Sequence, residues 1–226
     1  MKKWNNDDEL FKLMRHELYS AVIGDIMDKQ GYIHQFLSPR IRPLHDKMIV
    51  AGRAMTVLEM DMNRINDSNL LNKPFGLMLE ALDDLKRNEV YICTGASDTY
   101  ALWGELMTTR AKKTGSAGAV VDGYSRDTHG VLALDFPAFS YGCYAQDQAP
   151  RGKVVDFRIP LTFGEVKVNP GDIVFGDIDG VCVIPKLIEE EIIIKAFEKA
   201  NDEKIVKQKI EEGMPCCEAF AKYGVM

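Results

Sequence analysis

Two short polar segments in the middle of the chain carry residue types suited to binding an anion and a divalent cation. The first is Trp103-Gly104-Glu105, where a glycine directly precedes a segment with helical spacing of apolar residues. The free backbone N–H groups in the first turn of such a helix can bind a substrate carboxylate, and Gly104 has no Cβ to obstruct its approach. These groups belong to Glu105, Leu106 and Met107. The alternative is a glycine placed only for packing ahead of an ordinary helix.

The second segment runs from Asp122 to Asp127 and follows the apolar run 119–121. In α/β proteins ligands gather at the carboxyl ends of strands. Asp127 offers the hard oxygen ligand that Mg²⁺ and Mn²⁺ accept, and such sites take only one or two carboxylates and keep several waters. Arg126 is a permanent, fork-shaped cation suited to a carboxylate or an enolate oxygen. The alternative is that Asp127 only caps a helix beside a surface arginine.

The elements that must position these residues alternate between helix and strand. The first half is expected to hold helices over 8–19 and 20–31, strands over 48–50 and 54–58, a helix after Pro74 and a strand over 90–93. The centre is expected to hold a helix over 105–113, a strand over 119–121, a turn over 122–125, a helix beginning at Arg126-Asp127 and a strand over 138–141. A meander over 154–184, a long helix over 187–212 and a short tail helix follow. This order predicts an α/β protein in which helices cover sheets.

Length and charge narrow the class of protein. A chain of 226 residues with no linker or repeat is expected to form one domain over residues 1–226. The net charge of −6 argues against nucleic acid as a partner, because phosphate binding needs clustered lysine and arginine. No apolar run approaches the roughly 20 residues of a membrane span, and no apolar stretch of a secretory signal follows the basic start. We therefore expect no membrane partner and a cytoplasmic location.

The five cysteines predict reduced thiols. Cys93, Cys143 and Cys182 lie in apolar, strand-like stretches, and Cys216 and Cys217 are adjacent. An odd count without C-x-x-C spacing favours a reducing compartment and argues against both a zinc site and a disulfide framework.

The order and spacing of several motifs along the chain resemble those of one protein family. Glu105, twenty intervening residues and then Arg126-Asp127 resemble the acid-x20-Arg-Asp signature of the 4-hydroxy-4-methyl-2-oxoglutarate aldolase family. The wider RraA-like superfamily includes regulators of ribonuclease activity, and many of its sequences were once labelled dimethylmenaquinone methyltransferases. Further matches cover roughly residues 48–213. They are Gly115-x-x-Gly118-x-Val120-Val121-Asp122-Gly123, Val168-x-Pro170-Gly171-Asp172 and Asp177-x-Asp179-Gly180-Val181-x-Val183-x-Pro185.

The resemblance implies a fold and an assembly. The fold would be an αββα sandwich related to the swivelling phosphohistidine domains, here with N-terminal helices and an extended C-terminal helix. The assembly would be a homotrimer or a homohexamer with active sites between subunits. The sequence does not distinguish the two.

The resemblance also implies roles for individual residues. Asp127 would be the direct protein ligand of Mg²⁺ or Mn²⁺, while Glu105 and Asp122 would hold metal-bound waters. A 2-oxo acid substrate would chelate the metal, with its carboxylate at the N–H groups of residues 105–107 and its keto oxygen near Arg126. One departure is Glu105, because the family often has aspartate at that position.

The implied activity is a divalent-metal pyruvate aldolase that cleaves a 4-hydroxy-2-oxo acid to pyruvate and a carbonyl product, with oxaloacetate decarboxylation as a side reaction. A glutamate from a neighbouring subunit's C-terminal helix would assist proton transfer. Glu203 is the candidate, and its alternative is a solvated helix residue. His129 is expected to be a pocket or surface residue rather than a metal ligand. Loops over 60–69 and 141–151 would line the side of the pocket that holds the carbonyl product.

Two other functions stay open. A partner-binding regulator of ribonuclease activity would have the same fold, but such proteins are shorter and lack the extended C-terminal helix, so the helix over 187–212 favours catalysis. A dedicated decarboxylase or a sugar-acid aldolase is a second enzymatic possibility. A methyltransferase would need a glycine-rich cofactor loop after the first strand, and none is visible.

Overall fold

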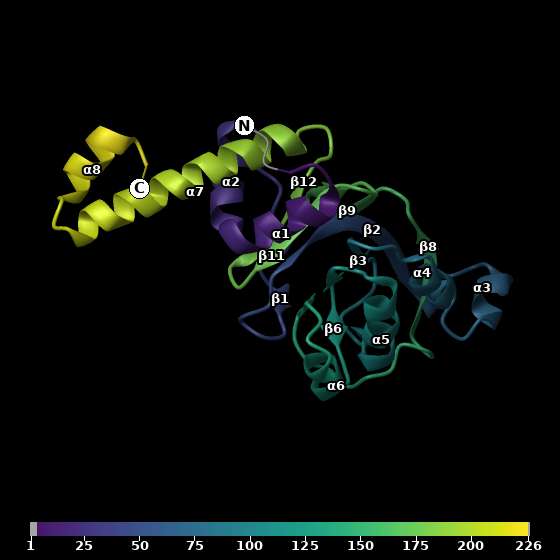
Figure 1. Ribbon diagram of the computed structural model, residues 1–226. Helices are drawn as coiled ribbons and strands as arrows, with labels where there is room; N and C mark the ends of the chain where they lie inside the picture. The colour runs from purple at the N-terminus through teal and green to yellow at the C-terminus, as the bar shows by residue number, and fades with distance from the viewer. Residues whose placement is uncertain (1–3, 226) are drawn as a thin grey trace.

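The computed structural model describes residues 4–225, which form a strongly curved sheet with helices packed around it (Figure 1). The helices are α1 (Asp7–Glu17), α2 (Ser20–Lys29), a 3-10 turn η1 (Met62–Arg64), α3 (Ser68–Asn72), α4 (Met78–Asp84), α5 (Glu105–Thr114), α6 (Thr128–Ala133), α7 (Glu189–Glu211) and α8 (Cys216–Tyr223). The strands are β1 (Arg42–Pro43), β2 (Val50–Asp61), β3 (Glu89–Thr94), β4 (Ala101–Trp103), β5 (Gly118–Val121), β6 (Tyr124–Ser125), β7 (Ala138–Ser140), β8 (Gly152–Phe157), β9 (Leu161–Phe163), β10 (Val166–Val168), β11 (Ile173–Asp177) and β12 (Gly180–Ile184).

The main sheet is organised around the long strand β2. The strand order is β1-β7-β5-β3-β2-β11-β12, with β8 also paired to β2. One edge of β2 pairs in parallel with β3, and β3, β5 and β7 continue in parallel. The other edge of β2 pairs antiparallel first with β11 and then with β8. The parallel half is connected through helices and the antiparallel half is the predicted meander, so the α/β class is confirmed.

The two ends of the sheet are joined by the segment 35–43, which makes the sheet a nearly closed barrel. The N–H of Leu37 donates to the carbonyl of Val181 in β12, and the N–H of Val183 donates to the carbonyl of Gln35, each at 2.9 Å. The same segment then enters β1, where Arg42 pairs with Ser140 of β7. Pairing of both sheet edges leaves few strand hydrogen bonds open.

Alternating side chains along the strands divide the core between the inside and the outside of the barrel. The inner cluster includes Val50, Ala54, Val90, Ile92, Val120, Phe139, Val174 and Val181, together with apolar residues of the β9–β10 hairpin. On the outside, α1, α2 and α7 pack against β11 and β12, and α4, α5 and α6 pack against β3 and β5. The period of two along each strand explains this division.

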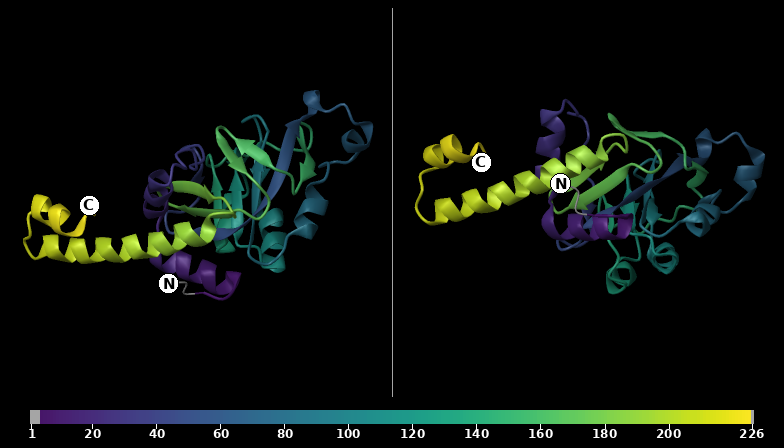
Figure 2. Two further views of the ribbon diagram at one scale, coloured as in Figure 1. Left: turned by 90° about the horizontal axis from the view of Figure 1, so that it is seen from above. Right: turned by 45° about the horizontal axis from the view of Figure 1, so that its top comes forward.

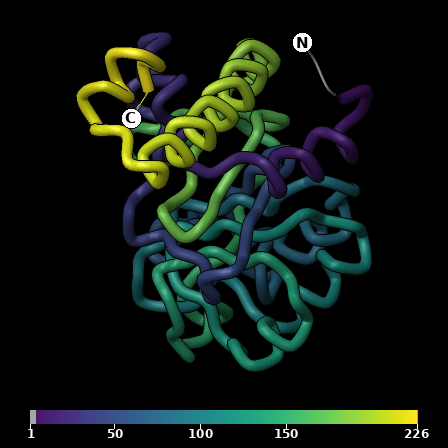
Figure 3. Tube along the Cα trace, turned by 60° about the vertical axis from the view of Figure 1, so that its left-hand side comes forward, coloured from purple at the N-terminus to yellow at the C-terminus, as the bar shows by residue number. Residues whose placement is uncertain are grey.

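The helix α7 extends beyond the body of the molecule and carries α8 at its far end (Figures 2 and 3). Its buried residues are concentrated in its first half, from Ile192 to Ala200, with Val206 the last of them. Its N-terminal half therefore belongs to the core, and the rest projects away from the sheet.

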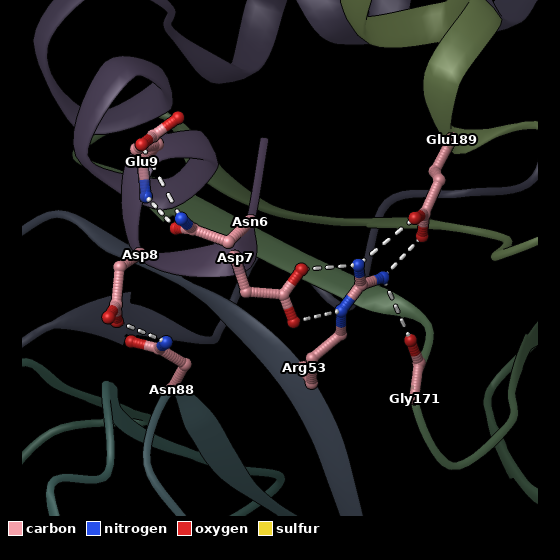
Figure 4. A network of polar contacts seen from close by, with 8 residues as sticks. All are labelled: Asn6, Asp7, Asp8, Glu9, Arg53, Asn88, Gly171 and Glu189. Carbon is pink, nitrogen blue, oxygen red and sulfur yellow. Dashed lines mark hydrogen bonds and ion pairs between the residues drawn. The ribbon is translucent and has the colours of Figure 1, made fainter. Parts of the chain in front are cut away.

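A polar cluster around Arg53 ties α1 and α7 to the sheet (Figure 4). The Arg53 guanidinium binds Asp7 of α1 through Nε and Nη2, at 2.9 and 2.7 Å. It binds the carboxylate of Glu189 at the start of α7, with Nη2 at 3.0 Å from Oε1, and Nη1 donates to the carbonyl of Gly171 at 3.3 Å. Only 18% of the Arg53 side chain is exposed. This arginine is fully used in holding three elements together.

Two sequence predictions of local structure were wrong. The strands expected over 48–50 and 54–58 are one strand, β2, because Gly52 is not a turn residue. A Cβ on Gly52 would lie 2.5 Å from the carbonyl oxygen of Asn88, so the glycine permits close strand packing. The turn expected over 122–125 is also partly strand, since Tyr124–Ser125 form β6 and pair in parallel with β4.

All five cysteines are free thiols. Cys93 and Cys182 are buried, as their apolar surroundings predict, but Cys143 is exposed and lies outside the strands. Among residues 4–225, none of the helices has the length and apolar character needed to cross a bilayer.

Candidate active site

The two polar segments singled out in the sequence meet beside the short β4–β6 pair. The N–H of Arg126 donates to the carbonyl of Trp103 at 2.9 Å, which continues the pairing of the two strands. A Cβ on Gly104 would lie 2.9 Å from Oδ2 of Asp127. The glycine is therefore needed because the Asp127 carboxylate lies directly against the backbone that begins α5.

The start of α5 is held rigidly and leaves its first N–H groups open. Gly104 is the N-cap residue, and its carbonyl accepts from both the N–H and the hydroxyl of Thr108, at 3.0 and 2.9 Å. The indole N–H of Trp103 donates to the same hydroxyl at 2.8 Å. The N–H groups of residues 105–107 have no acceptor within a helix that begins there, so they are available to an anion.

Asp127 has an uncommon backbone conformation. It precedes α6 with φ 56° and ψ 36°, in the left-handed region, and its side chain makes no capping hydrogen bond with that helix. Aspartate tolerates this region better than most residues, but the conformation still costs free energy. The Asp127 side chain therefore does not act as a helix cap, although the residue stands at the N-cap position of α6. Its carboxylate is about half-exposed and points back toward Gly104.

Arg126 lies between two carboxylates without being enclosed by them. Its Nη1 donates to Oδ1 of Asp147 at 2.7 Å, and its Nε is 3.5 Å from Oδ2 of Asp127. The side chain is 38% exposed. The remaining guanidinium N–H groups are free to bind a further anion, since Arg carries five donors.

These groups line a pocket of about 370 Å³. Its walls are formed by Phe75, Met78, Leu79, Leu82, Asp83, Ala101, Leu102, Trp103, Gly104, Leu106, Met107, Arg110, Arg126, Asp127, Asp147 and Gln148. Of the predicted site residues, Gly104, Leu106, Met107, Arg126 and Asp127 are therefore brought together. The volume is that of a small-molecule site.

Glu105 and His129 lie beside the pocket rather than on its walls. The Glu105 side chain packs over α6, where a Cβ on Gly130 would lie 2.2 Å from its Cδ. Glu105 is thus next to the first turn of the helix that Asp127 precedes. His129 is exposed on the same helix, in agreement with a surface histidine.

Asp122 faces a different hollow. It accepts hydrogen bonds from the hydroxyls of Thr94 and Tyr141, at 2.7 and 2.5 Å, and lies near Phe163 and Val166 of the β9–β10 hairpin. Burial, followed by the bond to Asp122, raises the pKa of Tyr141 to about 12. Asp122 continues the inward alternation of Val120, whereas the pocket of Asp127 lies outside the barrel. The two aspartates are therefore not brought together within one chain.

Glu203 is on α7, and Figure 1 shows that helix at the end of the molecule away from α5 and α6. It lies in a groove between α2 and α7 and pairs with Lys199, which also binds Asp25 at 2.8 Å. Burial raises the pKa of Glu203. Glu203 does not share a pocket with Asp127 in one chain.

Several residues in and beneath the pocket were not singled out in the sequence. Asp147 and Gln148 come from the loop 141–151, which was expected to line the pocket, whereas no lining residue comes from 60–69. The amide of Gln148 donates to Oε1 of Glu59 at 2.8 Å. Glu59 is only 1% exposed, and burial raises its pKa to about 8. Glu59 is thus a buried acid that binds the pocket residue Gln148 from the core side.

The donor set at Asp127 suits a magnesium or manganese ion. No group of three or more histidine, cysteine or acidic residues forms a ligand cluster in residues 4–225. Mg²⁺ and Mn²⁺ do not need such a cluster, because one carboxylate and several waters suffice. Asp127 offers a carboxylate that is not used for capping, and the missing Cβ of Gly104 leaves room beside it. These residues therefore fit the ion that the family resemblance implies.

Comparisons with known proteins identify the family of this chain. A family model described as RraA-like, Aldolase/RraA, matches residues 20–183. A protein of Halalkalibacterium halodurans named "Putative 4-hydroxy-4-methyl-2-oxoglutarate aldolase" is 32% identical over 185 residues, 81% of this chain and 82% of the relative. A Pseudomonas aeruginosa protein of the same name is 30% identical and covers 74% of this chain and 96% of its own length.

Among solved structures, Streptomyces coelicolor RraAS2 is described as an unusual member of the RNase ES inhibitor RraA protein family. It is 25% identical, with a TM-score of 0.77, over 91% of this chain and all of that one. The family thus contains proteins described in two different ways, as aldolases and as an inhibitor relative.

Proposed function

Because this chain belongs to the RraA-like Aldolase/RraA family, we propose that it is a divalent-metal pyruvate aldolase acting on a 4-hydroxy-2-oxo acid. The observation that carries the proposal is the position of Asp127. Its carboxylate lies against Gly104 at the open start of α5, beside the partly free guanidinium of Arg126. A carboxylate, the start of a helix and a permanent cation thus share one pocket.

In this proposal Asp127 would hold Mg²⁺ or Mn²⁺, and Glu105, beside the first turn of α6, would bind water near it. The role predicted for Asp122 as a water acceptor stays a prediction. When bound, the ion supplies Lewis-acid stabilisation of negative charge on the substrate's oxygens.

The chain's own residues bind and polarise the substrate. The N–H groups of residues 105–107 bind the carboxylate next to the keto group, with help from the positive end of the helix dipole. Arg126 faces the keto oxygen and stabilises the negative charge that develops there as the bond between C3 and C4 breaks. Asp147 holds the guanidinium in place through its 2.7 Å bond.

The reaction moves two protons. A base removes the proton of the C4 hydroxyl, the C3–C4 bond breaks to give a carbonyl product and the pyruvate enolate, and an acid then protonates C3. We propose that Glu203 of a neighbouring subunit takes part, in a homotrimer or a homohexamer. Burial raises the pKa of Glu203, which favours the protonated form that an acid needs. Loss of CO₂ from oxaloacetate would give the same enolate, so decarboxylation is the expected side reaction.

A regulator of ribonuclease activity is the second candidate, favoured by the likeness to RraAS2. A protein that acted only by binding a partner would not need an Asp127 in the left-handed region or an arginine with open donors in a pocket. Its partner binding would also persist when the Asp127 carboxylate is removed.

The test measures pyruvate release from 4-hydroxy-4-methyl-2-oxoglutarate, 4-hydroxy-2-oxohexanoate and oxaloacetate with Mg²⁺, Mn²⁺ or EDTA. Asp127→Asn keeps the shape of the side chain and removes its charge, and we expect a loss of kcat/KM of about 10³-fold or more. Asp135→Asn is the matched control, since Asp135 is also an exposed aspartate with positive φ, next to the other end of α6, and does not line this pocket. Equal activity of the two variants would refute the assignment, and absence of metal-dependent pyruvate formation would refute the aldolase.

A further inference from the structure

The side-chain amide of Gln148 lies at the wall of the candidate pocket and has one end without a partner. The side chain is only 6% exposed. Its Nε2 donates to Oε1 of Glu59 at 2.8 Å, and among residues 4–225 no N–H or O–H group donates to its Oε1. In the same residues every fully enclosed side-chain nitrogen or oxygen has a partner, so the unpartnered Oε1 opens to the pocket.

The direction of this amide is fixed from the core side. Glu59 is 1% exposed and takes the N–H end of the amide, so the carbonyl end faces the other way. The backbone is also held, because the carbonyl of Gln148 accepts from the N–H groups of Arg151 and Gly152, at 2.7 and 2.9 Å. The pocket therefore contains a neutral hydrogen-bond acceptor whose position is set before any ligand binds.

The charged side chains of the pocket face one another. Arg126 binds Asp147 at 2.7 Å and lies 3.5 Å from Asp127, and Arg110 binds Asp83 at 2.8 Å. An amide carbonyl accepts a hydrogen bond and does not take up a proton, so its partner in the pocket must carry a proton to donate. Water meets this requirement and keeps lone pairs for a second partner.

We propose that the Gln148 carbonyl holds the water that removes the proton of the substrate's C4 hydroxyl, and that Glu59 is the residue that positions this carbonyl. The proposal rests on the proposed function for the reaction itself. Asp147 binds Arg126 through Nη1, whereas Asp127 lies near Nε. The loop that carries Gln148 thus follows Arg126 on the side away from Asp127, where a substrate with its keto oxygen at Arg126 continues toward C4.

The step balances without a further reactant. The C4 hydroxyl donates to the water, and the water donates to Oε1 of Gln148. The O–H electron pair forms the new C4 carbonyl, the C3–C4 electron pair passes into the pyruvate enolate, and the water takes the proton and passes it to solvent. Positive charge develops on the water during this transfer, so its bond to the carbonyl is stronger in the transition state than in the bound substrate.

The experiment compares two reactions that give the same enolate. Cleavage of 4-hydroxy-4-methyl-2-oxoglutarate requires removal of a hydroxyl proton, whereas loss of CO₂ from oxaloacetate does not. Gln148→Met keeps the length of the side chain and removes the carbonyl. We expect it to lower kcat/KM for the hydroxy acid by about 10-fold or more. We expect kcat/KM for oxaloacetate to stay within about threefold, because the pyruvate half is bound as before.

A second variant separates the lost acceptor from the lost contact with Glu59. Glu59→Gln combined with Gln148→Glu exchanges the two side chains, which keeps both the buried bond and an acceptor oxygen toward the pocket. The exchange should restore the ratio of the two activities to near the wild-type value. Gln146→Met is the matched control, because Gln146 belongs to the same loop and does not line the pocket, and it should leave the ratio unchanged.

Three results would overturn the assignment of Gln148. They are equal losses of both activities in Gln148→Met, an exchange variant that shows the same selective loss, and a changed assembly mass with an unchanged ratio, which would mean that the carbonyl binds a second copy of the chain. In each case wild-type pyruvate formation leaves the aldolase proposal intact. A wild type that forms pyruvate from neither substrate would overturn both proposals.

Discussion

Arg53 and Arg126 each lie between two carboxylates, yet their surroundings differ. Arg53 makes five hydrogen bonds to Asp7, Glu189 and the carbonyl of Gly171, and its side chain is 18% exposed. The guanidinium of Arg126 makes one hydrogen bond, to Asp147, and lies 3.5 Å from Asp127, and the side chain is 38% exposed. The five N–H donors of the Arg53 guanidinium are all used, whereas the Arg126 guanidinium has donors left open.

The comparison shows that residue type alone does not separate a structural ion pair from one with the function proposed for Arg126. The two arginines differ in the number of guanidinium N–H donors left open and in the elements that surround them. Arg53 is bordered by elements that must be held together, namely α1, β2 and α7. Arg126 is bordered by a pocket, by the open start of α5, and by an aspartate in a costly backbone conformation.

The largest expected effect comes from changing each arginine to lysine, which keeps the charge and removes the fork. Arg126→Lys should lower kcat/KM for pyruvate release by about 100-fold or more with little change in melting temperature, because oriented donors at a developing oxyanion are lost. Arg53→Lys should leave kcat/KM within a few-fold and lower the free energy of unfolding by about 2 kcal/mol, because partly buried carboxylates lose bidentate partners. Steady-state kinetics and chemical denaturation of both variants test this. The same pattern of losses in both would break the comparison.

A smaller effect is expected at the carboxylates that hold the two arginines. Asp147→Asn should lower kcat/KM by about 10-fold, since Arg126 remains but is oriented less well. Glu189→Gln is the matched change at Arg53, and it should lower stability and leave kcat/KM unchanged. If Asp147→Asn destabilised the protein as much as Glu189→Gln does, without an effect on turnover, the bond to Arg126 would be merely structural.

The smallest effect on turnover is expected at Glu59, the buried acid beneath the pocket. The amide of Gln148 and the charge of Lys153 favour its ionised form, but burial and the charge of Asp61 oppose it, and its pKa is raised to about 8. The folded state therefore holds a proton that the unfolded state releases near its ordinary pKa. Stability from this group is complete below that value and is lost as pH rises toward 8, by at most about 1.4 kcal/mol per pH unit.

Glu59→Gln should remove this dependence while keeping the contact with Gln148. Urea denaturation at pH 5, 6, 7 and 8 would show a flatter stability profile for the variant than for the wild type. Glu165→Gln is a suitable control, because Glu165 is a largely exposed acid on the other side of the barrel. An unchanged profile in Glu59→Gln would mean that Glu59 is ionised in the folded protein.

Sequence patterns predicted the parts of the site that lie on regular elements. The helix that begins at Glu105 and ends at Gly115 follows from its apolar spacing and from glycine in the left-handed region after it. The approach of Arg126 and Asp127 to that helix follows from the motif spacing. These features depend on short segments of the chain.

The parts that were missed depend on contacts between distant segments. Asp147 and Gln148 belong to a loop with contacts to distant segments, since the N–H of Ala101 donates to the carbonyl of Gln146 and the amide of Gln148 donates to Glu59. Glu59 follows an apolar strand and resembles an ordinary acid at a strand end, but pairing with β8 extends β2 through it, with an irregularity between Leu58 and Glu59. Asp122 was expected beside Asp127, and the alternation along β5 turned it toward the barrel interior instead.

The closure of the barrel by the segment 35–43 has a consequence for how the chain can fold during synthesis. The strand β12, which that segment pairs with, lies nearly 150 residues further along. A chain that has left the ribosome only as far as β7 has an open sheet, with one edge of β2 unpaired until β8 and β11 follow. Such a chain presents a long, apolar edge strand, the feature that favours pairing with other chains. Folding of the proposed catalytic half can begin early, but its protection from aggregation comes only when the last strands emerge.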